Sequence, residues 1–404
     1  MKIDLLDPAS FAGGQPHGQF AWLRANAPVY RHPEPGGPGF WAVTRYRDIV
    51  EVERDFRRFS NSPTIMIADP DPEFSLDLGE RRMMLTMDPP RHTAFRKLIR
   101  DAFTDAAAAG MQAGIRGLAT RIVNGVIGKG ECDFVADVAG EMPSFVIAEM
   151  MGLPPEDGRE LYKLTEIIHT SPDVLPRDEI VNAVIAMFDY AEGVIREKRA
   201  RPGSDLASRI LQAEVDGERL DDLDFKLFFL LLIDAGGDTT RNLVAGGLLA
   251  LLEHPETMAR LRADISGLLP GAREELLRWC SPVIYMRRTV TEDAEIAGQA
   301  VAEGDKVVLY YGAANRDGGH FDRPDRFDIG RSPNDHLAFG TGPHRCLGMH
   351  IARVEIDALL AEVLERMHDL ELAAEPEWLE SNFISGPRRM PVRFRPGPER
   401  SCEA

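Results

Sequence analysis

The stretch from His336 to Glu355, HLAFGTGPHRCLGMHIARVE, constrains this chain more than any other. It carries one thiol, Cys346, on a glycine-rich loop that leads into a helical pattern of apolar residues. Glycines allow strained main-chain conformations in which several N–H groups can point at one sulfur atom. These N–H groups and the positive end of the following helix favour the thiolate over the thiol. A thiolate in this position can act as a nucleophile or as a metal ligand.

A second constraint is the helical pattern from Asp222 to Glu253, the longest in the chain. At a rise of 1.5 Å per residue it predicts a helix of roughly 45 Å, enough to cross a domain. Its unbroken apolar run, Leu227 to Ile233, is too short for a membrane span. Gly236 and Gly237 lie in its middle, where each glycine costs about 1 kcal/mol relative to alanine. Either a neighbouring helix packs closely there, or the helix opens locally where a flat cofactor and a small ligand approach.

Composition narrows the possible functions. Of 404 residues, 44% are hydrophobic and 28% are charged, as in an ordinary soluble globular protein. The formal net charge of -18 argues against long-range attraction to nucleic acid or to an anionic membrane. The four cysteines form no C-x-x-C pair, which excludes a zinc finger or a disulfide framework. With no apolar N-terminal segment long enough for a signal peptide or anchor, the sequence predicts a cytoplasmic protein, and we expect a monomer.

The decapeptide FGTGPHRCLG, residues 339–348, resembles the haem-ligating loop of the cytochrome P450 monooxygenases, F-G-x-G-x-H-x-C-x-G, at every fixed position. Three further motifs appear in the family's order. DPPRHTAFR resembles the helix that binds the haem propionates, AGGDTT resembles the oxygen-binding groove, and an E-x-x-R pair resembles a buried ion network. The chain is similar to the bacterial soluble P450 enzymes over almost its whole length.

The resemblance implies a mainly α fold. In the family this is a single-domain triangular helical prism with small β-sheets and a long central helix, which would here span residues 1–404. The expected parts are β-rich segments at about 28–60 and 283–330, a helical part at about 91–280 and the ligand loop at 336–348. Local patterns add helices at Gly18–Ala27 and Tyr46–Arg54, strands within Val29–Val43, helices through most of 105–212, a β segment at 281–298 and a strand-like tail at Ser381–Arg395.

The resemblance also implies haem b, with Cys346 as the axial ligand of its iron. A thiolate ligand favours O–O cleavage, an effect for which the P450 enzymes are the standard example. Counting back from Gly298 selects Arg288 rather than Arg287 as a propionate partner. The implied cofactor-binding residues are His92, Arg96, Arg288 and His344 for the propionates, with Phe339, Gly340, Gly348, Ala235 and Gly236 around the ring. Without the family motifs, His92 and Arg96 would read as an ordinary pair on one helix face.

The expected catalytic residues are Asp238 and Thr239. The resemblance implies that Thr239 hydrogen-bonds the oxygen substrate and that Asp238 helps to deliver protons from solvent. One oxygen atom would enter a C–H bond and the other would leave as water. Glu275 and Arg278, with Arg326 as the expected third member, are assigned to a structural network behind the haem loop.

The expected substrate pocket is apolar, which favours an uncharged hydrophobic molecule. Its predicted wall residues are Ile65, Met66, Ile233, Ile284, Tyr285, Met286, Phe383 and Ile384. The long loop Asn61–Gly79, with Phe74 and Leu76, either covers the substrate or simply folds onto the core. A terpenoid, a sterol or a branched lipid is the expected substrate; a fatty acid, a macrolide or an aromatic intermediate remains open.

Electrons must come from another protein, because the chain contains no flavin or iron–sulfur motif. We expect a small acidic ferredoxin, itself reduced by an NAD(P)H-dependent ferredoxin reductase. Basic residues near the thiolate side could dock it: Arg96, Lys97, Arg100 and Arg345. Two alternatives stay open, a peroxygenase that uses hydrogen peroxide and a non-catalytic haem protein that senses a small ligand. The paired Asp238 and Thr239 argue against both.

Overall fold

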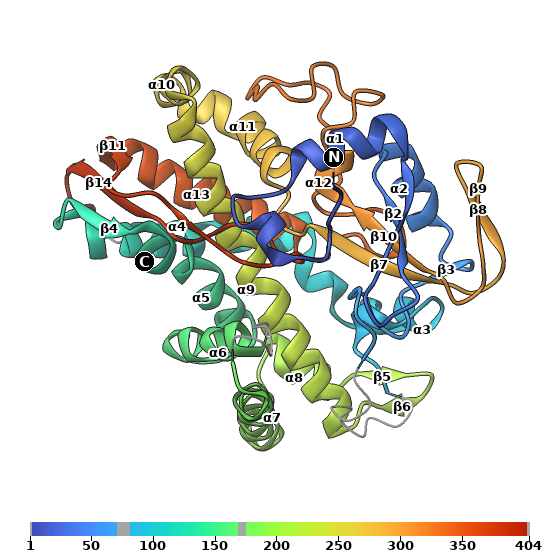
Figure 1. The fold of residues 1–404 in the computed structure, drawn as a ribbon. Coiled ribbons are helices and arrows are strands. Elements are labelled where there is room, and N and C mark those ends of the chain that lie inside the picture. The colour runs from blue at the N-terminus through green and yellow to red at the C-terminus, as the bar shows by residue number, and fades with distance from the viewer. Residues whose placement is uncertain (1, 71–80, 169–174, 402–404) are drawn as a thin grey trace.

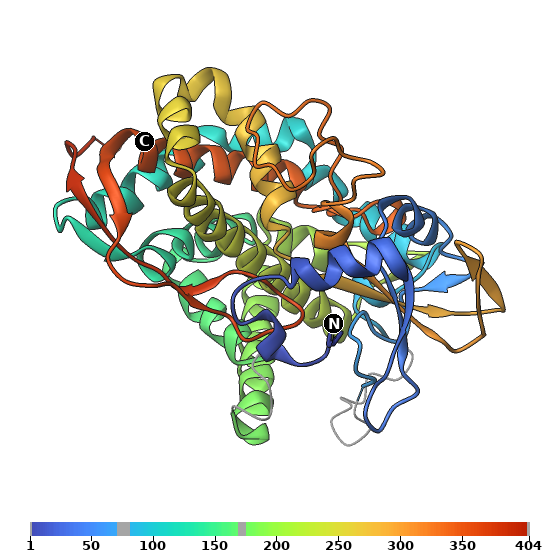
Figure 2. The same cartoon turned by 45° about the horizontal axis from the view of Figure 1, so that its top comes forward.

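A computed structural model describes residues 2–70, 81–168 and 175–401. Helices fill one side of the molecule and a five-stranded sheet lies on the other, in both views of the chain (Figures 1 and 2). The helix α9, Asp222–Glu253, runs between them through the middle of the molecule. Helices α4 (Asp105–Ile127), α5 (Glu141–Met150), α11 (Ile265–Cys280) and α13 (Met349–Arg366) pack into the largest hydrophobic core together with α9. The mainly α architecture with small sheets is as expected.

The bounds of α9 match the sequence prediction at both ends, for local reasons. Asp221 accepts a hydrogen bond from the Asp224 N–H, and the Asp224 carboxylate accepts one from the Asp221 N–H, which makes a capping box. The helix ends at Glu253 with His254 as its C-cap, and Pro255 begins α10 (Pro255–Ala263). The helix is continuous, so of the two explanations for its glycines the local opening is wrong.

Close packing explains one of these glycines. A Cβ atom on Gly237 would lie 2.8 Å from Cδ2 of Tyr162, on helix α6 (Pro155–Ile168). A Cβ on Gly236 would meet only Ile147, at 3.5 Å, which is an ordinary contact. Gly237 therefore lets α6 approach α9, which was the simpler of the two explanations.

The large sheet joins distant parts of the chain in the order β1-β2-β10-β7-β3, with β1 (Val29–His32) and β3 (Phe59–Ser60) at its edges. Strand β10 (Lys306–Tyr310) pairs in parallel with β2 (Phe40–Val43) and antiparallel with β7 (Tyr285–Val290). Every residue of β10 is buried, since side chains alternate between the two covered faces of the sheet. Val307 and Leu309 face the core formed with helix α2, whereas Val308 and Tyr310 face the core formed with α1.

The remaining elements follow the predicted pattern with small shifts in their bounds. The helix expected at Gly18–Ala27 is α1, His17–Asn26, and α2 is Tyr46–Arg54 as predicted. The other helices are η1 (Pro8–Phe11), η3 (Met84–Thr86), α3 (Arg91–Ile99), η4 (Arg100–Phe103), η5 (Val135–Ala139), α7 (Arg177–Ala200), α8 (Leu206–Leu211), α10 (Pro255–Ala263), α12 (Tyr311–Ala314) and η6 (Gly342–His344). The other strands are β1 (Val29–His32), β3 (Phe59–Ser60), β4 (Glu131–Asp133), β5 (Glu214–Val215), β6 (Glu218–Arg219), β8 (Ala294–Ile296), β9 (Gln299–Val301), β11 (Met367–Leu372), β12 (Glu377–Trp378), β13 (Pro387–Arg389) and β14 (Pro391–Pro396).

Two further predictions concern membranes and the long loop. Within residues 2–70, 81–168 and 175–401, no helix is long and apolar enough to cross a membrane. The loop predicted at 61–79 has no regular secondary structure over its described part, 61–70. Phe74 and Leu76 lie outside the described residues.

Candidate active site

An apolar cavity of about 270 Å³ lies in the interior between α9 and the start of α13. Cys346 lines it from one side, and Ala235, Gly236 and Thr239 of α9 line it from the other. Polar side chains gather at part of its wall: Glu53, His92, Arg96, Arg288, Tyr311 and His344. The expected ligand loop, the propionate-binding residues and the oxygen-binding groove therefore meet at one cavity.

The loop before Cys346 has the strained main chain that its glycines predict. Gly340 and Gly342 have φ angles of 61° and 67°, in the left-handed region that disfavours other residues. A Cβ atom on Gly342 would also lie 2.4 Å from the carbonyl oxygen of Glu53. Both the φ angle and this close approach therefore require glycine at position 342. The Cys346 N–H donates a 2.8 Å hydrogen bond to the carbonyl oxygen of Phe339, which closes the loop.

The state of the Cys346 thiol differs from the prediction. Burial raises the pKa of Cys346, and this effect outweighs the Gly348 N–H donated to its sulfur and the nearby charges of Arg96 and Arg353. The loop alone therefore does not produce a thiolate. A metal ion that binds the sulfur would do so, because a coordinating thiol is deprotonated by the ion.

Two histidines form part of the polar edge of the cavity. The rings of His92 and His344 stack with their centroids 3.9 Å apart. Burial lowers the pKa of His92 to about 4 and that of His344 to about 2, so both are neutral at pH 7. His92 Nδ1 and His344 Nε2 are buried without a hydrogen-bond partner in the described structure.

The two histidine nitrogens without a hydrogen-bond partner indicate whether haem fits the cavity. Arg96 lies beside them, and its guanidinium donates a 2.6 Å hydrogen bond to the carbonyl oxygen of Arg345. A group that brings carboxylates to this edge would pair with the arginines and satisfy the histidine nitrogens. A flat apolar ring would meet small residues on α9 and the Cys346 thiol on the loop. The residues present therefore fit haem.

The choice between two adjacent arginines is settled by strand geometry. Side chains of β7 alternate, so Arg288 lines the cavity while Arg287 points to the other face. Arg288 donates to Glu53 Oε1 at 3.1 Å. Arg287 instead donates to Asp69 Oδ1 at 2.6 Å and to main-chain carbonyls of the loop 61–70. The prediction of Arg288 as the residue on the cavity side agrees with this geometry.

On α9 the predicted acid and alcohol occupy different environments. Thr239 lines the cavity, and its hydroxyl donates a 3.3 Å hydrogen bond to the carbonyl oxygen of Ala235. Asp238 is 9% exposed and lies one position round the helix, away from the cavity wall. Consecutive residues on an α-helix face different directions, which accounts for the separation.

Asp238 belongs to a small polar cluster that the sequence did not reveal. The Tyr162 hydroxyl donates to Asp238 Oδ1 at 2.8 Å, and Arg241 Nη2 lies 3.2 Å from the same oxygen. Arg241 also pairs at 2.6 Å with Glu166, whose side chain is 45% exposed. Burial and the Asp238 charge raise the pKa of Tyr162, so it remains a donor. The cluster connects Asp238 to the protein surface.

Besides Glu53, the buried carboxyl of Glu355 lines the cavity. Glu355, on α13, is 4% exposed and is hydrogen-bonded to the Thr240 side chain. Burial raises the pKa of Glu355 to about 8. No sequence pattern points to this residue, because a glutamate in an amphipathic helix is usually on the surface.

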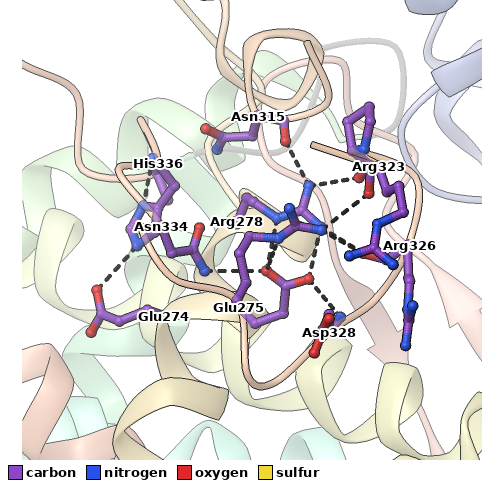
Figure 3. A network of polar contacts seen from close by, with 12 residues as sticks. Glu274, Glu275, Arg278, Asn315, Arg323, Arg326, Asp328, Asn334 and His336 are labelled. Atoms are coloured by element: carbon purple, nitrogen blue, oxygen red, sulfur yellow. Dashed lines mark hydrogen bonds and ion pairs between the residues drawn. The ribbon is translucent and has the colours of Figure 1, made fainter. Parts of the chain in front are cut away.

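Behind the ligand loop lies the expected ion network, with one correction (Figure 3). Glu275 and Arg278 are fully buried and form two hydrogen bonds of 2.8 Å. The second guanidinium on Glu275 belongs to Arg331, with Nε 3.1 Å from Oε2. Arg326 has an exposed side chain and contributes only its carbonyl oxygen, which accepts from Arg278. The prediction of Arg326 as the third member is therefore wrong.

The predicted substrate wall is largely wrong in detail. Met286 lines the cavity, but the other seven predicted residues do not. Alternation along β7 explains the nearest miss, since Met286 faces the cavity while Tyr285 turns to the opposite face, into the second core; Ile284, which precedes the strand, lies in the same core. That core also takes Ile65, Phe383 and Ile384, whereas Ile233 lies in the largest core and Met66 is 36% exposed. The apolar residues that do line the cavity include Met84, Leu85, Leu231, Leu232, Leu243, Pro282 and Val283.

Comparison with known proteins agrees with this site. The family model described as Cytochrome P450 matches residues 161–382. A methyl-branched lipid omega-hydroxylase of Mycobacterium tuberculosis is 40% identical over 390 residues, covering 93% of this chain and 90% of the relative. A steroid C26-monooxygenase of the same organism is 37% identical, covering 98% of both chains. The crystallised Mycobacterium marinum cytochrome P450 CYP268A2, in complex with pseudoionone, is 37% identical with a TM-score of 0.91 and covers 98% of this chain and 99% of that one. With its thiol loop, its histidine and arginine edge and its long central helix around one apolar cavity, this chain belongs to the cytochrome P450 family and is a haem-dependent monooxygenase.

Proposed function

We propose that this enzyme hydroxylates a hydrophobic small molecule of the lipid, steroid or terpenoid type. The observation that carries this proposal is the apolar wall formed by Met84, Leu231, Leu232, Val283 and Met286, in the same cavity as Cys346 and Thr239. An apolar wall favours a ligand that loses little hydration on binding. The named activities of relatives at about 40% identity, on methyl-branched lipids and on steroids, support the same class.

The residues that the sequence motifs selected have proposed parts in this reaction. Cys346 would bind the haem iron, and His92, Arg96, Arg288 and His344 would hold the propionates. When bound, haem supplies the activation of dioxygen and the transfer of one oxygen atom to the substrate. Thr239 offers its hydroxyl to the oxygen substrate inside the cavity. Asp238 moves protons inward from solvent, and its contacts with Tyr162 and Arg241 hold it in place for this.

The proposed electron donor is a ferredoxin reduced by an NAD(P)H-dependent reductase. Lys97, Arg100 and Arg345 are exposed, and α3 is tied to the ligand loop by the bond from Arg96 to Arg345. These charges lie on segments next to Cys346 and suit an acidic partner. Arg353, also basic, pairs with Glu274 through two 2.8 Å bonds and is not free for docking. A monomeric state, a cytoplasmic location and a single domain over 1–404 remain proposals from the sequence.

The proposal is tested by turnover with a ferredoxin and reductase pair. Steroids, methyl-branched fatty acids and terpenoids are first screened for a shift of the haem spin state in the purified enzyme. A compound that gives the shift is expected to be hydroxylated with steady consumption of NAD(P)H. Product formed only with hydrogen peroxide would indicate a peroxygenase, and binding without product by either route would indicate a sensor.

Substitution of Thr239 tests the proposed contact between its hydroxyl and the oxygen substrate. Thr239→Ala removes a hydroxyl that α9 offers at the cavity wall, next to Thr240, whose side chain is hydrogen-bonded to Glu355. Product formed per NAD(P)H consumed is expected to fall by about two to three orders of magnitude, the range for losing one donor to a reacting oxygen. Hydrogen peroxide should appear in place of product. Thr239→Ser keeps the hydroxyl and is the matched control; unchanged coupling in the alanine variant would remove Thr239 from the mechanism.

A further inference from the structure

Glu53 is a buried carboxyl at the polar edge of the cavity. It lies in the last turn of α2 and is 4% exposed. Its Oε1 accepts hydrogen bonds from the Tyr311 hydroxyl at 2.7 Å and from Arg288 Nη2 at 3.1 Å. Its Oε2 accepts the main-chain N–H of Thr341, at 2.8 Å, from the ligand loop. One carboxyl thus joins a helix, a strand and the loop that ends at Cys346.

These contacts give Glu53 a positioning role toward Arg288. Arg288 Nη1 donates to the carbonyl oxygen of Arg287 and Nη2 donates to Glu53, so both ends of its guanidinium are fixed. Its remaining N–H groups can serve a ligand in the cavity, because an arginine has five. Without Glu53, Arg288 and Tyr311 would lose the acceptor that orients them.

The charges at this edge do not balance if Glu53 is ionised. Among the described residues that line the cavity, Arg96 and Arg288 are the arginines, and there is no lysine. Haem brings two propionates, which two arginines can neutralise. Glu53 would be a third carboxylate at the same edge, and like charges at short distance disfavour ionisation. The C-terminal end of α2 also disfavours a negative charge there.

We propose that Glu53 carries a proton while haem is bound at neutral pH, and that it is a positioning residue of the propionate edge. Burial already raises the pKa of Glu53, against the opposing effects of Arg288, Tyr311 and the Thr341 N–H. Propionates nearby raise it further, so haem capture takes up a proton. The pKa of Glu53 is thus higher with haem bound than without it. Haem affinity is therefore highest at pH values below the haem-free pKa of Glu53, and it falls as the pH rises towards the haem-bound pKa. This inference rests on the haem site and not on the proposed substrate.

The reduction potential of the substrate-free holoenzyme tests the proposal. In the wild type, loss of the proton adds a negative charge near the iron and stabilises its more positive, ferric form. The potential is therefore expected to fall as the pH is raised from 6 to 9.5. Glu53→Gln mimics the protonated carboxyl, so its potential should equal the wild-type value at pH 6 and should lack that part of the pH dependence. Glu51→Gln, an exposed neighbour on the same helix, is the matched control.

The rate of haem transfer from the enzyme to apomyoglobin is a second measurement on the same proteins. Each unit by which haem raises the pKa of Glu53 corresponds to about tenfold in haem affinity. Wild-type haem loss should therefore accelerate at alkaline pH, and Glu53→Gln should be slower than the wild type there. Tyr311→Phe removes a donor that favours the ionised form, so the pH dependence should move to higher pH rather than disappear.

Two results would overturn the proposal. One is a Glu53→Gln potential that exceeds the wild-type potential by a constant amount at every pH, which would mean that Glu53 is always ionised. The other is a Glu53→Gln potential that already exceeds the wild-type potential at pH 7 and approaches it only at more acidic pH, which would mean that Glu53 has lost its proton at neutral pH. Neither measurement uses a substrate or a redox partner, so the result is separate from the fate of the proposed function.

Discussion

Replacement of Cys346 by alanine is expected to abolish the strongly red-shifted Soret band of the reduced carbon monoxide complex. That band is the signature of thiolate ligation, and the thiol of Cys346 lines the cavity where α9 presents Thr239. Hydroxylation should be lost with it, because no other described cysteine lines the cavity. The measurement is the difference spectrum of the reduced protein with and without carbon monoxide.

Cys132 provides the control for this experiment. It lies on β4, is partly buried, and burial raises its pKa to about 12, so it is an unreactive thiol. Cys132→Ala should keep both the red-shifted band and the activity. If Cys346→Ala retained the band, the ligand assignment would be wrong and another group would have to bind the iron.

Glu275→Gln is expected to have the largest effect on stability. Glu275 accepts five hydrogen bonds, from Arg278 twice and from Arg331, Asn334 and the Asp328 N–H. A neutral amide leaves the fully buried guanidinium of Arg278 without its counter-charge. Breaking a buried pair in this way typically costs about 3–5 kcal/mol. Since stabilities are about 5–15 kcal/mol in total, we expect a large loss of folded, haem-containing protein.

Thermal unfolding, followed by both the Soret band and circular dichroism, measures this loss. Arg326→Ala is the matched control, because the exposed side chain of Arg326 is absent from the network and its carbonyl remains. Its effect should stay within about 0.5 kcal/mol. Arg331→Ala should be clearly destabilising. The reverse order, with Arg326 the more sensitive of the two, would contradict the structure.

Sequence patterns were sufficient where a local signal sets the structure. The bounds of α9 follow from its capping box and from Pro255, and the loop geometry at Gly340 and Gly342 follows from glycine. The motif residues Cys346, His92 and Arg288 also lie together at one cavity, as expected. Each of these features is visible in a few neighbouring residues.

The predictions were wrong where the contacts of a side chain depend on its exact position along the chain. Arg331 rather than Arg326 reaches Glu275 because the irregular segment before the ligand loop folds back, and no periodicity describes such a path. In the predicted pocket wall, Tyr285 was wrong because it is one residue from Met286 on β7 and therefore faces the opposite side, whereas most of the other missed residues lie in the hydrophobic cores. Tyr162 and Glu53 were missed because each gains its role from a partner far away in sequence.

The order of strands in the large sheet has a consequence for synthesis of the chain. Phe40 on β2 pairs with Lys306 on β10, so an N-terminal hairpin must wait for a strand made much later. At about 5–20 residues per second, the delay is on the order of tens of seconds. During that time β2 has an open edge, which is a template for pairing with other chains. The sheet that places Arg288 is therefore exposed to misassembly on the ribosome, and slower translation after β2 should lower the yield of haem-loaded enzyme.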